Sequence, residues 1–114
     1  QVTKNFVYLY VVVLTKNYIG DRDMRKAVKN PITLEAMVEK FSLLSEIQLE
    51  NVNIVKKVHL QNMTILQLKV FMTKILLTST KKNHLYDAVW IKAILEQIAE
   101  QECQDPMSIY LRCN

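Results

Sequence analysis

Two neighbouring segments decide the fold: TILQLKVFMTKILL at residues 64–77 and HLYDAVWIKAILEQI at residues 84–98. In both, apolar residues recur at the i, i+3, i+4, i+7 spacing of one helix face. These stripes are Leu68, Phe71, Met72, Ile75 and Leu76 in the first segment, and Trp90, Ile91, Ile94, Leu95 and Ile98 in the second. Because only a short basic turn joins the segments, we expect a central antiparallel hairpin, with helices at residues 64–80 and 84–103.

Each helix of this hairpin also carries apolar residues away from its main stripe. They are Leu66, Val70 and Leu77 in the first helix, and Leu85, Ala88 and Val89 in the second. Three consecutive apolar residues, Val89 to Ile91, cannot all face one core, because successive helical residues point about 100° apart. Each helix is therefore either sandwiched inside the bundle or presents one side to a partner. The candidate contact residues are Val70, Leu77, Leu85, Val89, Trp90, Ile91 and Ile94. Plain core packing is the alternative for Trp90.

Length and composition indicate one folded helical domain. The chain has 114 residues, of which 50% are hydrophobic and 23% charged, as in ordinary globular proteins. One glycine and two prolines leave little material for the tight turns of a many-stranded β fold. We expect a single all-α domain over residues 1–114, a compact bundle of about five to seven helices.

Residues 6–14 form a continuous apolar run, FVYLYVVVL. The run is much shorter than the roughly 20 residues of a membrane-spanning helix, and it lacks the small-residue cleavage site of a signal peptide. We expect no membrane span here. A helix with no polar face must be covered on most sides, so this one should be central to the bundle or docked on another protein.

Helix boundaries are predicted from capping residues and breakers. Gly20 and Asp21 suggest a helix end followed by the N-cap of a short helix at residues 23–29. Thr33 is expected to cap a helix running from Leu34 as far as Ile47. The polar residues at 50–53 suggest another joint before the central hairpin.

Lysines are unevenly placed along the chain. Between Glu50 and Asp87 there is no acid, and this interval holds a candidate basic face of Lys56, Lys57, Lys69, Lys74, Lys81 and Lys82. The simpler interpretation is a solvated bundle surface, and the sharper one is contact with nucleic acid or an acidic partner. No RNA-binding motif with aromatic stacking residues is visible, so an RNA contact has no support from a motif.

The sequence offers little material for catalysis. It has one glycine, at position 20, so a phosphate-binding glycine loop is excluded. His59 and His84 lie on different segments, and neither has metal-ligand spacing from a cysteine. Acidic neighbours of Cys103 disfavour its thiolate. We therefore expect a protein that is not an enzyme and has no catalytic residues, no metal site and no cofactor.

Cys103 and Cys113 bear on the compartment. They flank the Asp105–Pro106 pair, which is typical of a helix start, so a helix–turn–helix would bring them within disulfide reach. Asn62 begins the triplet Asn62-Met63-Thr64, which fits N-glycosylation. Together these features favour a secreted helical bundle with a Cys103–Cys113 disulfide, of the cytokine-like, pheromone or gamete type. Two cysteines are equally ordinary inside cells, and Asn62 and Thr64 also suit the cap of the next helix.

Part of the chain resembles a known assembly unit. Lys69-Val70-Phe71-Met72-Thr73 and Trp90-Ile91-Lys92-Ala93-Ile94-Leu95 resemble two helices in the helical C-terminal domain of the WD-repeat subunits of the nucleolar small-subunit processome. Leu60 to Ile65 would be the entry element, and the match covers about residues 55–95. The resemblance implies a non-catalytic protein–protein assembly domain in ribosome biogenesis, located in the nucleolus. It would bind another helical domain or a second copy of itself; the secreted recognition protein is the alternative.

Overall fold

The computed structural model of the chain describes residues 17–22 and 24–104. Within these ranges all regular secondary structure is helical, with five α-helices and no strands, so the prediction of an all-α globule is confirmed. One continuous core draws on residues from Tyr18 to Ile98. The expectations for the apolar run at 6–14, for a helix after Asp105 and for Cys113 lie outside the described residues.

The helices follow one another with short connections. The first described helical residues are 17–22, and the later helices are α2 (Leu34–Glu39), α3 (Glu46–Val55), α4 (Ile65–Thr78) and α5 (His84–Gln104). A 3₁₀ turn at Lys40–Leu43 follows α2, a π-helical segment at Lys56–Leu60 extends α3, and a 3₁₀ turn at Lys81–Asn83 leads into α5.

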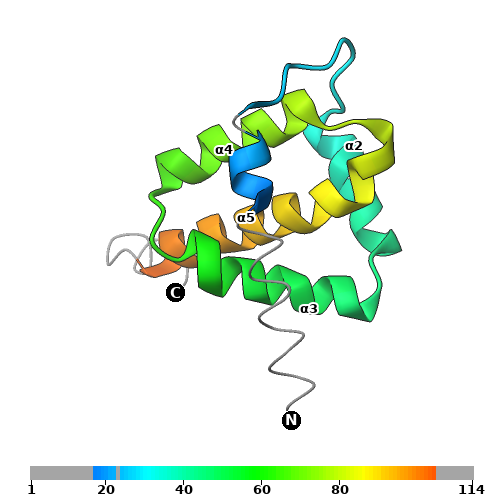
Figure 1. Cartoon of the computed structure of the whole chain (residues 1–114). Helices are drawn as coiled ribbons and strands as arrows, with labels where there is room; N and C mark the ends of the chain where they lie inside the picture. Colours follow the sequence, from blue (N-terminus) through cyan, green and yellow to red (C-terminus); the bar gives the residue numbers. More distant parts are fainter. Residues whose placement is uncertain (1–16, 23, 105–114) are drawn as a thin grey trace.

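The predicted hairpin of α4 and α5 is present, and α5 is its central member. Figure 1 shows α4 on one side of α5 and α3 on the other, with α2 near the beginning of α5. All three helices contact α5. Trp90, Ile91 and Ile94 are accordingly almost completely buried. The two-sided apolar pattern of α5 therefore reflects a helix sandwiched inside the bundle.

Local capping explains where α2 and α4 begin. The Thr64 hydroxyl oxygen accepts a hydrogen bond from the Gln67 backbone N–H (3.1 Å), and the Thr64 backbone N–H donates to Gln67 Oε1 (2.9 Å). This is a complete capping box, which satisfies two backbone donors at the start of α4. Thr33 similarly accepts from the Ala36 backbone N–H at 3.1 Å. Both threonines thus cap the helices that the sequence predicted.

Three boundary predictions are wrong. The helix expected from Leu34 to Ile47 stops at Glu39, because Leu44 is extended and Ser45 forms its own capping box with Gln48. That cap starts α3, which then runs without a break through the joint expected at 50–53. Near the beginning of the chain, residues 17–22 are helical, so Gly20 does not end a helix, and residues 25–29 form none.

A buried polar cluster fastens residues 17–22 to the hairpin. Arg22 forms an ion pair with Asp87 and donates from Nη1 to Thr78 Oγ1 at 2.7 Å. The Tyr18 hydroxyl donates to Asp87 Oδ1 at 2.7 Å, and the Tyr18 ring stacks on Trp90 with a centroid distance of 4.3 Å. Sequence reasoning missed this cluster. The available signal was that Asp87 lies on the same helix face as Trp90 and Ile91.

Candidate protein interface

One face of α4 is apolar and exposed. Leu66 is 72% exposed, Val70 58% and Leu77 42%. With the exposed residue Thr73, they follow one another at spacings of four, three and four residues, which places them in one stripe along the helix. The opposite face of α4, with Leu68, is in the core. Both hairpin helices, α4 and α5, have apolar residues on two sides. In α4 the second apolar side is not covered by other described residues.

Two adjoining hollows border this stripe. One, of about 360 Å³, is lined by Ile19, Met63, Leu66, Gln67, Val70, Phe71 and Lys74. The other, of about 500 Å³, is lined by Arg25, Ala27, Lys69, Val70, Thr73, Lys74, Leu77 and Thr78. Because both include Val70 and Lys74, they form one groove along α4. Ile19, Arg25 and Ala27 line its far side. Next to Ala27, the Val28 N–H donates a hydrogen bond to the Leu77 carbonyl oxygen of α4 (2.8 Å).

The described residues that line the groove include basic side chains and no acidic ones. Helix α4 itself contains Lys69 and Lys74 but no aspartate or glutamate. Arg25 also lines the groove, although its charge is partly offset by an ion pair with Asp21 at 2.7 Å. An apolar stripe beside basic side chains, of which Lys74 also has an interaction of its own, is thus the main uncovered feature of this helix.

The candidate contact residues divide between surface and core. Val70 and Leu77 lie on the exposed face of α4, and Leu85 is 38% exposed. The other four, Val89, Trp90, Ile91 and Ile94, are buried. Their assignment to a contact surface is corrected to core packing, because α3 and α4 cover α5 from both sides. Trp90 meets Tyr18 face to face and the edge of Phe71 at a centroid distance of 5.6 Å.

The six lysines of the candidate basic face lie in three separate places. Lys69 and Lys74 line the α4 groove, and Lys81 and Lys82 lie in the turn before α5. Lys56 and Lys57 line a polar pocket between the end of α3 and the end of α5. The structure therefore does not gather these lysines on one continuous surface.

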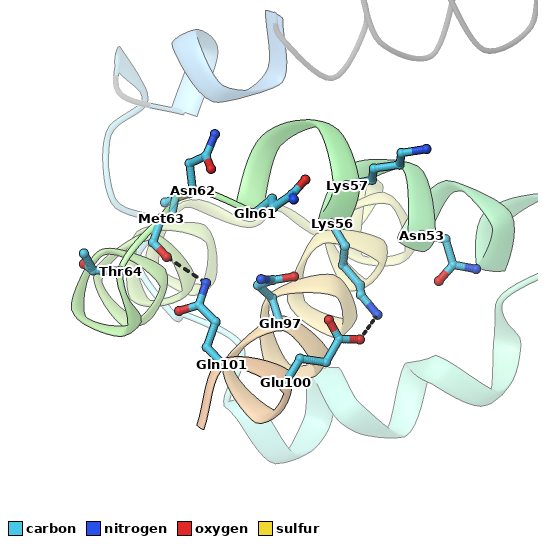
Figure 2. A pocket seen from close by; sticks show the side chains of 10 residues that line it. All are labelled: Asn53, Lys56, Lys57, Gln61, Asn62, Met63, Thr64, Gln97, Glu100 and Gln101. Carbon is cyan, nitrogen blue, oxygen red and sulfur yellow. Dashed lines mark hydrogen bonds and ion pairs between the residues drawn. The ribbon is translucent and has the colours of Figure 1, made fainter. Parts of the chain in front are cut away.

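The polar pocket has a volume of about 600 Å³ and is shown in Figure 2. Lys56 Nζ lies 2.7 Å from Glu100 Oε1 and 3.1 Å from Glu96 Oε1. Gln101 Nε2 donates to the Met63 carbonyl oxygen at 2.8 Å. Figure 2 shows Gln97, Glu100 and Gln101 projecting from α5 toward the neighbouring segments. These contacts tie the end of α5 to the segment that precedes α4.

The charged groups of this pocket stabilise one another. Partial burial lowers the pKa of Lys56, but hydrogen bonds to Glu100 and Glu96 outweigh it, so the pKa is raised above its ordinary value. Burial raises the pKa of Glu96, but Lys56 and Lys92 outweigh that effect and hold it below its usual range. Both groups are therefore held in their charged forms.

The two histidines lie in different environments. The His59 ring lies over Trp90 at a centroid distance of 5.7 Å, and burial lowers its pKa. Burial, with a further contribution from Lys40, lowers the pKa of His84. Among residues 17–22 and 24–104 there is no group of three or more potential metal-ligating side chains. No described helix combines the length and hydrophobicity of a bilayer-spanning segment.

Of the three residues that bear on secretion, Asn62 and Cys103 are among those that the structure describes. The side chain of Asn62 is exposed beside the polar pocket, and Cys103 is exposed near the end of α5. Cys113 lies outside the described residues, so the disulfide stays a prediction.

Comparison of the chain with protein-family models, with curated proteins and with solved structures finds no match. The assignment of a function therefore rests on the physical character of its surfaces.

Proposed function

We propose that this protein is a non-catalytic assembly domain that binds another protein through the exposed face of α4. The observation that carries the proposal is the uncovered stripe of Leu66, Val70 and Leu77 on a helix whose other face is in the core. Scattered exposed apolar residues are normal, but an aligned stripe beside a groove is typical of an interaction surface. Helix-in-groove binding uses this kind of surface.

The resemblance of residues 55–95 extends this proposal to a ribosome-biogenesis complex, with the nucleolus as its location. Under this proposal the partner is a helical domain of the same complex. Both halves of the resembling unit lie in the α4–α5 hairpin, of which α5 supplies the core and α4 supplies the free face.

Site-specific photo-crosslinking tests the proposed surface. A photoreactive residue replaces Leu66 or Leu77 in the full chain, produced in its native cells, and the adducts are identified by mass spectrometry. We expect both positions to give the same protein adduct, because they lie on one stripe. The control position is Lys57, which is exposed beside the polar pocket and away from the α4 groove. Adducts from Lys57 but none from α4 would contradict the proposed surface.

A secreted recognition protein is the second candidate, and the exposure of Asn62 favours it. The glycosylation triplet lies in an accessible turn before α4, where an attached glycan would not displace core residues. Intact mass of the secreted chain before and after glycosidase treatment tests this candidate. A mass that does not change would remove its structural support.

A further inference from the structure

Residues 17–22, the covering segment, lie between the apolar face of α4 and Trp90 of α5. On one side, Ile19 lines the same hollow as Phe71 and part of the exposed stripe of α4. On the other side, the Tyr18 ring stacks on Trp90, and the edge of Phe71 meets the same indole. Figure 1 shows this segment in blue, over the ribbons of α4 and α5. Departure of the segment would therefore join the α4 stripe, Phe71 and one face of Trp90 in a single apolar surface.

Polar contacts that are costly to bury help to hold the covering segment in place. Arg22 pairs with Asp87 and donates to Thr78, and both charged side chains are almost completely buried. The attraction within such a pair is largely offset by its loss of hydration. Arg22 Nε and Asp87 Oδ2 have no hydrogen-bond partner among the described residues, so both atoms are better solvated when the segment leaves. The net stabilisation from these contacts is therefore small.

The covering segment also has a weak helical preference of its own. Gly20 lies inside it, and glycine is among the least favourable residues in a helix interior. Nothing lies within 4 Å of the position that a Cβ on Gly20 would occupy, so close packing does not require a glycine here. Residues 25–33, which separate the segment from α2, contain no helix or strand. The segment can therefore leave without the unfolding of another helix.

We propose that the covering segment detaches while α2 to α5 remain folded, and that this opening enlarges the apolar binding face of α4. Local opening is expected where few apolar contacts hold a segment. In the closed state the segment inhibits binding of a partner helix, because it borders the groove and covers Trp90. A partner that binds the larger face more tightly shifts the equilibrium toward the open state. This inference rests on the proposed assembly function and concerns the regulation of the same surface.

Native-state hydrogen exchange of the full chain, followed by NMR, tests the separate opening. We expect the amides of residues 21 and 22 to be protected, but to exchange at least roughly tenfold faster than those of residues 90–98 in α5. Gly20→Ala favours the helix and should slow exchange in the segment severalfold, without altering exchange in α5. Equal rates in both regions, or an equal effect of Gly20→Ala on both, would overturn the proposal. So would a complete lack of protection in the segment, because the closed state would then not form.

Trp90 is the single tryptophan of the chain, so its fluorescence reports on the covering segment. Arg22→Met leaves the Asp87 charge unpaired in the closed state and should shift the chain toward the open state. We expect acrylamide to quench this variant at least roughly twofold more efficiently, while circular dichroism retains most of the helical signal. Arg25→Met is the matched control, because Arg25 pairs with Asp21 at the exposed surface (2.7 Å), and it should leave quenching unchanged.

Unchanged quenching in Arg22→Met would overturn the proposal. Increased quenching that accompanies loss of the whole helical signal would also overturn it, because the segment would then unfold only with the entire domain.

Photo-crosslinking from position 66 connects the opening with binding. Arg22→Met should raise the yield of the α4 adduct and Gly20→Ala should lower it, because the two variants shift the opening in opposite directions. Adducts from the control position, Lys57, should not change. An unchanged yield at position 66 in chains that do open would refute the regulation, although the assembly function would stand. Absence of any α4 adduct, in wild type and in Arg22→Met, would instead contradict the assembly function and the regulation with it.

Discussion

Asp87 illustrates how a charged residue is accommodated inside this bundle. Its side chain is completely buried and accepts hydrogen bonds from Tyr18 and Arg22, which is itself 2% exposed. Asp87 Oδ2 and Arg22 Nε have no hydrogen-bond partner among the described residues. Desolvation of such a pair is costly, so its attraction is largely consumed in offsetting that cost. The pair fixes the position of residues 17–22 more than it stabilises the fold.

The effects of replacing the two members of the Arg22–Asp87 pair should be strongly non-additive. We expect Asp87→Ala to lower the free energy of unfolding by about 3–5 kcal/mol, because it leaves the Arg22 charge buried and unpaired. The double variant Arg22→Met, Asp87→Ala should lose clearly less than the sum of the single losses. Urea unfolding followed by circular dichroism measures each value. A loss below about 1 kcal/mol for Asp87→Ala would show that the pair is not buried in solution.

Tyr18 should make the fold sensitive to alkali. Burial, and next the Asp87 carboxylate, raise the pKa of the Tyr18 hydroxyl far above its ordinary value of 10.0. The folded protein therefore holds this proton more tightly than the unfolded chain does. The resulting stability is fully present below pH 10.0 and is lost as the pH rises above that value.

The slope of stability against pH tests this linkage. Above about pH 10 the free energy of unfolding should fall more steeply than in Tyr18→Phe, by about 1.4 kcal/mol per pH unit for one proton. Urea unfolding at a series of alkaline pH values gives both slopes. Tyr86→Phe is the control: the pKa of Tyr86 is also raised by burial and by Asp87, but its side chain is exposed. Its effect on the slope should be smaller, and equal slopes for wild type and Tyr18→Phe would contradict the prediction.

At the scale of elements, α4 and α5 carry similar apolar patterns but occupy different places. Val70 of α4 is exposed, whereas Val89 of α5 is buried. We expect Val70→Asp to change the free energy of unfolding by less than about 0.5 kcal/mol. Val89→Asp should prevent folding, because it buries an unpaired charge. Thermal melting distinguishes the two, and unfolding of both variants would show that the α4 face is covered in the native chain.

The beginning of α4 depends on one side chain. Thr64→Ala removes the acceptor of the capping box and should lower the free energy of unfolding by about 1 kcal/mol. Thr73 on the exposed side of the same helix is the matched control, because its hydroxyl donates to the Lys69 carbonyl oxygen at 3.0 Å and caps no helix end among the described residues. Thr73→Ala should be close to neutral, since alanine also favours the helix. Denaturant unfolding of the two variants checks the difference.

At the scale of the whole molecule, the cysteines separate the two proposed functions. For an intracellular assembly domain, Cys103 and Cys113 should both react with an alkylating agent without prior reduction. The double variant Cys103→Ser, Cys113→Ser should then keep its free energy of unfolding within about 1 kcal/mol. Intact mass spectrometry before and after alkylation measures the first outcome. A bridged native protein, with a loss of about 2–3 kcal/mol in the double variant, would instead favour the secreted protein.

The sequence by itself determined the local structure well. Apolar spacing located the α4–α5 hairpin, and Thr33 and Thr64 located the beginnings of α2 and α4. These features depend on residues three or four positions apart, which are in contact as soon as a helix forms. The prediction failed at residues 39–45, where a 3₁₀ turn and the Ser45 capping box together end one helix and begin another.

Only the tertiary structure decided which side of each helix is covered. Val70 and Val89 have equivalent positions in their local patterns, and nothing within either helix distinguishes them. The cover of α5 comes from α4 on one side and α3 on the other (Figure 1), and Tyr18 stacks on Trp90. Of these, α3 and Tyr18 are distant from α5 in sequence. The Arg22–Asp87 pair was not predicted for the same reason. Its two residues are far apart in sequence, and a buried charge can be recognised only when its partner is known. The candidate interface was therefore predicted in part, at Val70 and Leu77, because exposure is a property of the packed molecule rather than of the helix.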